Sequence, residues 1–154
     1  MALMAVLLAA VAAAMHASFT SYAENNDLAE VTQSARAVLT RLTGEVRTAD
    51  SVTCTSTRVT AVYLNNPDVQ QVEYELSDGT LWYRRTVGGN TTSYGLLGGQ
   101  DRVQVSAFNV TAEAGLDSQQ QACTKCVIVR LDLSVNNKPL PLTASADIRK
   151  NQTY

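Results

Sequence analysis

The residues best suited to chemistry are two cysteines in the sequence Cys123-Thr124-Lys125-Cys126, the spacing of a redox dithiol or of half a zinc site. A redox motif normally opens a helix after a strand, whereas this pair precedes the strongest strand pattern of the chain, and no second pair completes a zinc site. We therefore predict a structural disulfide, either within the pair or from Cys54 to one of its members. The sequence leaves the pairing open.

The other candidate groups lack chemical partners. His16 is the only histidine and lies at the end of an apolar run, where a polar group near a membrane interface is a simpler interpretation than a proton or metal site. The glycine-rich segment 88–101 has no Gly-Lys-Ser/Thr, so we interpret it as a loop pinned by two leucines. Glu73 and Glu75 alternate along one solvated strand face. We expect no enzyme, no cofactor and no metal.

Charge and length exclude one large class of function. The chain has 154 residues and a net charge of -2, and no run of Lys or Arg appears anywhere. Nucleic-acid binding would need a basic patch. We therefore predict no nucleic-acid partner.

The segment 1–50 must position the rest of the chain. Because it has no Gly or Pro before Gly44, it predicts one helix of roughly 70 Å, too long for a small domain to bury. Its first part, 1–23, carries no charge, while 24–50 is amphipathic. The apolar face of the second part, which we expect to pack on a sheet, consists of Leu28, Val31, Val38, Leu42 and Val46, with Ala35 between them.

Three interpretations of the apolar run compete. A complete membrane span takes about 20 apolar residues, and polar residues dilute this run after His16. A cleaved secretory signal would explain the alanines, but no basic region precedes them. A span whose beginning lies upstream of Met1 accounts for both the short run and the missing basic residues, and we favour it.

The helix resembles that of the type IV pilin-like family, which includes the pseudopilins of type II secretion. Its segments LMAVLLAAVAAAM (3–15) and SYAENNDLAEVTQSARAVLTRLTGEVRTAD (21–50) are similar to a pilin helix without its opening turns. VEYELSDGTLWYRR (72–85) and ADIRKN (146–151) are similar to the globular parts of J-type minor pseudopilins and W-type minor pilins. The family's glycine before the cleavage site, aromatic first residue and early glutamate are absent, so no processing or methylation site is assigned.

The resemblance implies a structural subunit of a type II secretion pseudopilus or type IV pilus. Such a subunit is held in the bacterial inner membrane by a single span, with its globular domain on the periplasmic or extracellular side, before it joins a filament. Its partners would be other pilin-like subunits and possible secreted cargo or tip partners. We assign the assembly contacts, which small residues favour by allowing close helix approach, to Leu3, Val6, Leu7, Ala10 and Ala14.

After Asp50 the pattern becomes alternating, and 51–154 predicts a globular β domain. Six strands are expected, at 59–64, 69–76, 80–87, 102–112, 127–135 and 142–148. Asp78-Gly79 predicts a tight hairpin, 65–68 a turn, and 59–87 a three-stranded meander. The segments 88–101 and 113–126 are expected to be long loops.

The strand parity predicts one apolar and one wet face, for example with Val127, Val129 and Leu131 together and Arg130 opposite. The predicted fold is therefore α+β, a long N-terminal helix packed on an antiparallel sheet. Two other functions stay open: a membrane-anchored or secreted β-sheet binding module that acts alone, and a periplasmic thiol-disulfide enzyme that uses Cys123 and Cys126.

Overall fold

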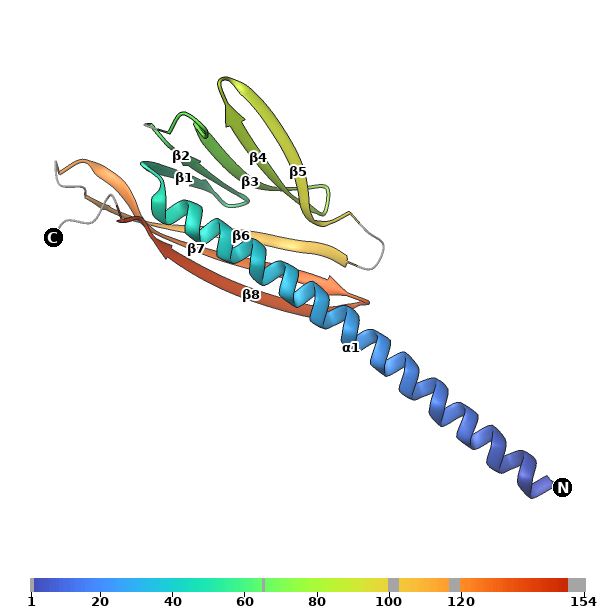
Figure 1. Cartoon of the computed structure of the whole chain (residues 1–154). Helices are drawn as coiled ribbons and strands as arrows, with labels where there is room; N and C mark the ends of the chain where they lie inside the picture. Colours follow the sequence, from blue (N-terminus) through green and yellow to red (C-terminus); the bar gives the residue numbers. More distant parts are fainter. Residues whose placement is uncertain (1, 65, 100–102, 117–119, 150–154) are drawn as a thin grey trace.

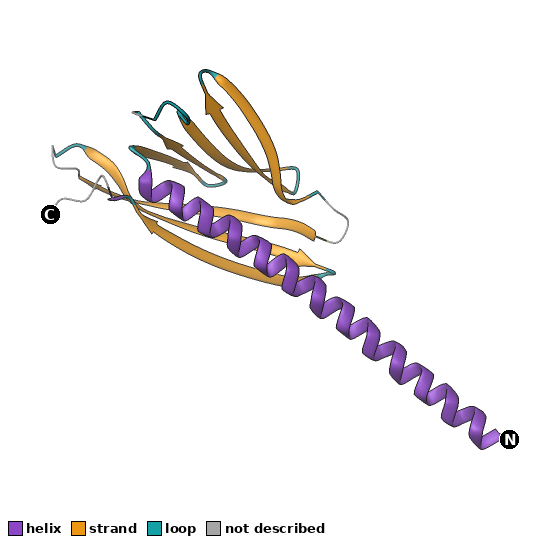
Figure 2. Ribbon diagram, in the orientation of Figure 1, coloured by secondary structure: helices purple, strands orange, loops and turns teal. Residues whose placement is uncertain are grey.

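The computed structural model describes residues 2–64, 66–99, 103–116 and 120–149 and shows one long helix followed by antiparallel strands (Figure 1 and Figure 2). The elements are α1 (Ala2–Thr48), β1 (Ser51–Thr55), β2 (Arg58–Val62), β3 (Gln71–Ser77), β4 (Thr80–Val87), β5 (Asn90–Gly98), β6 (Val103–Leu116), β7 (Ala122–Val135) and β8 (Lys138–Asp147). The predicted α+β fold, with a long N-terminal helix on antiparallel sheet, is confirmed.

Helix α1 runs for 47 residues without interruption. Its first half projects into solvent, while its second half lies in the angle between two sheets (Figure 1). Gly44, the only glycine in the helix, sits one turn before the end, and the buried Leu42 and Val46 on either side of it hold this turn against the core. The helix has no break between its apolar and its amphipathic half, as the lack of Gly and Pro before Gly44 predicts.

The first sheet has five strands in chain order, β1-β2-β3-β4-β5. The predicted meander from 59 to 87 is thus correct. Asp78 and Gly79 both have positive φ, 51° and 69°, as a two-residue hairpin turn requires. In the predicted turn before β3, the Asn66 side-chain oxygen accepts hydrogen bonds from the backbone N–H groups of Asp68 (2.9 Å) and Val69 (3.2 Å). Asn65 lies outside the described residues.

The second sheet has three strands, β6-β7-β8. A tight turn at Asn136 and Asn137, with φ of 48° and 63°, joins β7 to β8. Pro139 and Pro141 lie in β8, an edge strand, where the missing N–H groups can face solvent. The two prolines therefore make this edge of the sheet unfavourable for pairing with a further strand.

Two predicted loops are strands in the structure. Most of 88–101 is β5, and 113–116 and 122–126 are the ends of β6 and β7. Strand β1 was also not predicted, and a single sheet was expected where two are found. The first half of β5 is exposed on both faces, so its sequence carries no apolar alternation, and pairing with β4 holds it extended. The outer ends of β6 and β7 also lack a regular apolar alternation, and their pairing with each other holds them extended.

One core lies between the helix and both sheets. It receives inward-facing side chains from every element, and the largest that are fully buried are Tyr74, Phe108, Leu42, Leu81, Leu131, Leu133 and Ile148. Leu97 is buried and Leu96 packs against the core, as expected of the two leucines that pin this region. The apolar parity predicted for β7 is confirmed, since its five alternate residues from Val127 to Val135 are all buried.

The two sheets meet closely at one glycine. Gly98 ends β5 with φ of +87°, and a Cβ atom there would lie 2.2 Å from the carbonyl oxygen of Gly79. The same carbonyl oxygen accepts a hydrogen bond from the N–H of Val105 in β6 (3.3 Å). Only a residue without a side chain fits this joint.

Candidate membrane and assembly segment

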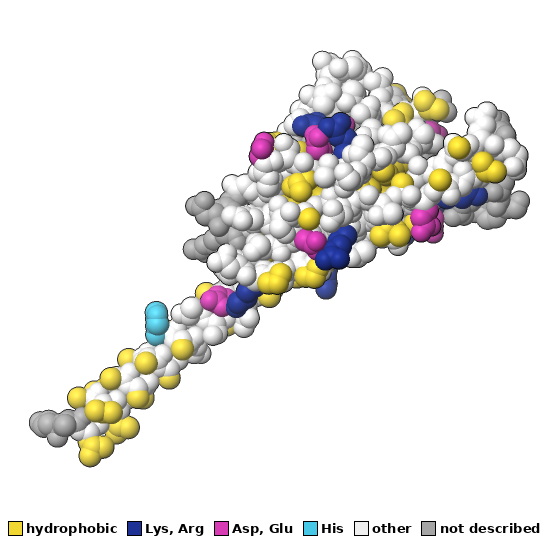
Figure 3. All heavy atoms as spheres, turned by 180° about the vertical axis from the view of Figure 1, so that it is seen from behind, with side chains coloured by type: hydrophobic (Ala, Val, Ile, Leu, Met, Phe, Trp, Pro, Cys, Tyr) yellow, Lys and Arg dark blue, Asp and Glu magenta, His cyan; other side chains and the backbone are white. Residues whose placement is uncertain are grey.

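The projecting half of α1 exposes a set of large apolar side chains. Leu3 is 80% exposed, Leu8 71% and Phe19 68%. Figure 3 shows these side chains along the whole rod, with the charged groups beginning where the rod meets the β domain. By length and composition, α1 is apolar enough to cross a membrane, and none of its most apolar 18-residue window is buried. The helix is thus compatible with a single-pass membrane anchor.

The predicted assembly residues all lie on this exposed half. Leu3, Val6 and Leu7 are exposed by 60% or more, and Ala10 and Ala14 are also exposed. At 3.6 residues per turn their spacing places them along one side of the helix. The contact that they were expected to make is with another chain, so their role stays a prediction.

A row of larger side chains follows another side of the same half and was not singled out in the sequence. Its members recur at spacings of three and four residues, which keeps them on one face: Met4, Leu8, Val11, Met15, Phe19 and Tyr22, all at least 55% exposed. A neighbouring side carries the small residues Ala5, Ala9, Ala12 and Ala13, which are exposed as well. The rod therefore has a bulky side and a small side.

Two polar contacts hold the helix where it leaves the β domain. The ammonium group of Lys138 lies 2.6 Å from a carboxylate oxygen of Glu24, and the amide nitrogen of Asn136 lies 3.3 Å from a carboxylate oxygen of Asp27. Asn136 lies in the β7-β8 turn, and Lys138 is the first residue of β8. The Asn136-Asn137 pair could have been identified in the sequence as a turn that requires positive φ, but its contact with the helix could not.

The predicted packing face of α1 lies against the sheets to different degrees. Leu42 and Val46 are fully buried, Val31 and Val38 are partly buried against the core, and Leu28 is only half-buried near the point where the rod emerges. The buried positions Leu39 and Ala49 were not included in the predicted face. The second half of α1 is thus part of the β domain core.

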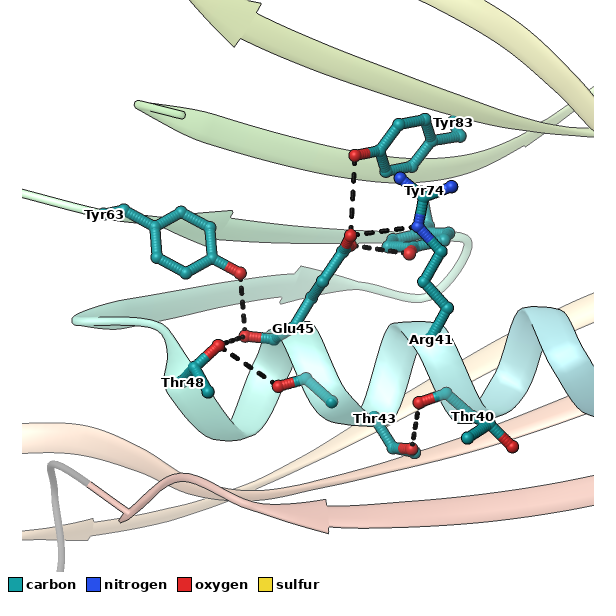
Figure 4. A network of polar contacts seen from close by, with 9 residues as sticks. Thr40, Arg41, Thr43, Glu45, Thr48, Tyr63, Tyr74 and Tyr83 are labelled. Carbon is teal, nitrogen blue, oxygen red and sulfur yellow. Dashed lines mark hydrogen bonds and ion pairs between the residues drawn. The ribbon is translucent and has the colours of Figure 1, made fainter. Parts of the chain in front are cut away.

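A polar network connects the last turns of α1 to the five-stranded sheet (Figure 4). One Glu45 carboxylate oxygen accepts a hydrogen bond from the Tyr74 hydroxyl (2.6 Å), and the other accepts from Arg41 Nε (3.1 Å) and lies 3.5 Å from the Tyr83 hydroxyl. The Tyr63 hydroxyl donates to the Glu45 backbone carbonyl (2.9 Å). Burial first, and then the hydrogen bond and the negative charge of Glu45, raise the pKa of Tyr74 far above its usual value. Tyr74 therefore stays a hydrogen-bond donor at any physiological pH.

The solvent-facing side of the same sheet carries paired charges. Arg84 bonds to the carboxylates of Glu73 (2.7 Å) and Glu75, and Arg58 bonds to Glu75 and lies 3.7 Å from Glu73. The hydrogen bond from Arg58, with a second from Arg84, holds the pKa of Glu75 below its usual value. These two glutamates form the predicted wet face and are structural ion-pair partners.

The predicted disulfide is not present, because Cys54, Cys123 and Cys126 are all free thiols. Cys123 and Cys126 lie along one strand, β7, on either side of an irregularity in its pairing with β6, and they face Gly115 and Glu113 of that strand. Cys54 lies on β1 in the other sheet and packs against the core. Burial raises the pKa of the Cys54 thiol to about 11, and burial together with Asp147 raises the pKa of Cys126. Neither thiol is activated as a nucleophile.

No cluster of three His, Cys, Asp or Glu side chains that could hold a metal ion occurs in the described ranges. His16 is exposed on the projecting rod, and Thr20 donates to its backbone carbonyl (3.0 Å). The chemistry of this region is therefore that of an apolar surface interrupted by a few polar groups.

Comparisons with known proteins do not assign a family. The sequence matches no protein-family model, and it finds no match among curated proteins or solved structures. The class that the fold defines is broader: a long N-terminal helix followed by antiparallel sheet is compatible with a pilin-like fold.

Proposed function

We propose that this protein is a structural subunit of the pilin-like class, a minor pilin or pseudopilin, which resides in the bacterial inner membrane before it assembles through its N-terminal helix. The observation that carries the proposal is the division of one unbroken helix into two environments. Its second half is built into the core of the β domain, while its first half exposes large apolar side chains to solvent.

The length of the projecting half fits a bilayer. Residues 2–23 would span about 33 Å as a helix, close to the roughly 30 Å of a hydrocarbon core. The first acidic side chains, Glu24 and Asp27, come directly after this stretch and contact the β domain. In this arrangement the charges stay in the interfacial water and the β domain rests on the membrane surface.

In an assembly, the apolar surface of the projecting half would be buried against the helices of neighbouring subunits instead of lipid. The bulky and small sides of the rod differ in shape, so the bulky side of one helix can pack against the small side of another. Such a contact joins two different faces and leaves one of each free, which allows a chain of subunits to continue. A symmetric contact of two small sides would stop at a dimer.

Cysteine cross-linking of the full chain in phospholipid vesicles tests this proposal. A13C places a thiol on the small side and M15C places one on the bulky side. We expect the double variant to form an oxidative ladder beyond dimer, while the unsubstituted chain, with its three native thiols, gives the background. In a bacterial host with a pilus or pseudopilus, a photo-cross-linker at Val11 should also capture pilin-like subunits.

The competing function is a membrane-anchored binding module that acts alone. That protein would partition into vesicles equally well, because the apolar half suffices for anchoring. It would give no ladder and no captured pilin-like subunit. A chain that stays monomeric in both experiments contradicts the assembly proposal.

A further inference from the structure

A groove lies between α1 and the inner face of the β4-β5 hairpin. It encloses about 440 Å³ and is lined by both cationic and aromatic side chains: Arg41, Tyr83, Arg85, Thr92, Tyr94 and Leu96. It lies on the opposite face of the sheet from the Glu73 and Glu75 ion pairs, since Arg85 and Arg84 alternate along β4. Neither the proposed membrane span nor the proposed helix contact uses it.

Arg85 is the unusual member of this groove. Its Nη2 donates to the backbone carbonyl of Asp68 (2.9 Å), and its buried Nε has no hydrogen-bond partner within the described part of the chain. Arg58 and Arg84 on the same sheet, by contrast, each contact carboxylates. A guanidinium offers several N–H donors in a planar fork that matches a carboxylate. Arg85 thus has donor capacity and positive charge that no acidic side chain of the described residues uses.

The rest of the groove favours an anion beside an apolar group. Arg41 donates its Nε–H to Glu45 and places its guanidinium 3.9 Å above the Tyr83 ring, and Arg85 lines the same groove. Tyr94 is 54% exposed and its ring centre lies 6.3 Å from that of Tyr83. An aliphatic side chain of a ligand could cover the Tyr94 ring while a neighbouring carboxylate of the same ligand approaches Arg41 and Arg85.

The edge of the sheet supplies the third feature. Strand β5 is the last strand of the five-stranded sheet, and its residues 90–95 are exposed. Its outer backbone edge, which pairs with no strand among the described residues, can pair with an added strand. Arg85 pairs with Thr92 across the β4-β5 ladder, so a residue placed beside Thr92 on the added strand would lie about 10 Å from Arg85 on the same face. A glutamate at that position and Arg85 are together long enough to meet above the short Thr92 side chain.

We propose that the β5 edge and this groove bind an extended polypeptide segment of a neighbouring subunit, with a carboxylate at Arg85 and an apolar side chain two residues away on Tyr94. The identity of the partner as a subunit rests on the proposed function. The chemistry of the groove does not, because it can be tested with a peptide in the absence of any assembly.

The test uses two heptapeptides, acetyl-Thr-Leu-Thr-Glu-Thr-Leu-Thr-amide and the same peptide with Gln in place of Glu. Each is titrated into the full chain in detergent micelles and followed by NMR of the 90–95 amides and of the arginine Nε–H signals. We expect the Glu peptide to shift the β5 amides and the Arg85 Nε–H signal, and to bind about tenfold more tightly than the Gln peptide, since its hydrogen bond to the guanidinium is charge-assisted.

Two variants separate the groove from general charge effects. R85Q should reduce the affinity for the Glu peptide to that for the Gln peptide. R130Q removes a 60%-exposed arginine on the other sheet and should leave the difference intact. Equal affinity of both peptides for the unsubstituted chain, or no shift of the β5 amides, overturns the inference. Because the arginine signals are observed in the unsubstituted chain, the result stands even if R85Q folds poorly. Peptide binding by a chain that gives no cross-linked ladder would refute only the assembly proposal.

Discussion

Replacing the same amino acid in the two halves of α1 should separate folding from anchoring. Leu42 is 0% exposed and Leu8 is 71% exposed, although both lie on one helix. L42A removes buried methyl and methylene groups and leaves a cavity in a core bounded by two sheets, which costs about 3 kcal/mol of unfolding free energy, within the usual range of roughly 2–5 kcal/mol. L8A removes the same atoms from a side chain outside that core.

The assay is urea unfolding of the full chain in detergent micelles, followed by the fluorescence of Trp82, the only tryptophan. With a urea dependence of about 2 kcal/mol per M, L42A should lower the midpoint by roughly 1.5 M. L8A should change it by less than about 0.3 M, since substitutions outside the core rarely exceed 0.5 kcal/mol. L8A should instead weaken partitioning into vesicles, which L42A leaves unchanged.

Similar midpoints for both variants would refute this reasoning, because they would mean that the second half of α1 is not part of the β domain core. A large midpoint shift for L8A together with a small one for L42A would reverse the assignment of the two halves.

Three further changes test other parts of the structure. G98A should destabilise the fold by about 2 kcal/mol or more, because a Cβ collides with the Gly79 carbonyl and the backbone has positive φ, and thermal unfolding measures the loss. The lowered pKa of Glu75 means that its ion pairs stabilise the fold fully above the usual glutamate pKa of about 4.3, and that this contribution is lost as pH falls through the lower folded value. E75Q should therefore make the fall of stability at acid pH less steep. An unchanged acid dependence contradicts the ion pairs. The raised pKa of Tyr74 means that its contribution is complete below about pH 10 and declines at higher pH, where the unfolded chain ionises; Y74F should have a shallower alkaline limb, with tyrosinate absorbance as the second readout.

The sequence identified the elements whose side-chain pattern is repeated many times. The helix could be predicted because no breaker interrupts 1–43 and its apolar positions recur every three or four residues. The β7 strand and the Asp78-Gly79 hairpin follow from equally direct local rules. In these segments local preference and tertiary packing agree.

The missed features depend on partners that are distant in sequence. Strand β5 has exposed threonines and is extended because β4 pairs with it, and the tips of β6 and β7 support each other in the same way. The network around Glu45 joins the helix to tyrosines 18, 29 and 38 residues later, and no local pattern marks it. The predicted disulfide is absent, since all three thiols are free, and the spacing of cysteines along the chain does not tell how a strand places them.

The unbroken helix also has a mechanical consequence. The part before Glu24 is a lever of about 33 Å whose fulcrum is the Lys138 contact, so a tilt of about 10° at the β domain moves the free tip by roughly 6 Å. Because the helix has no break along its length, a force on the β domain is transmitted to the free tip of the rod. If the protein has the proposed function, a force that draws it out of the membrane could therefore act on the β domain alone.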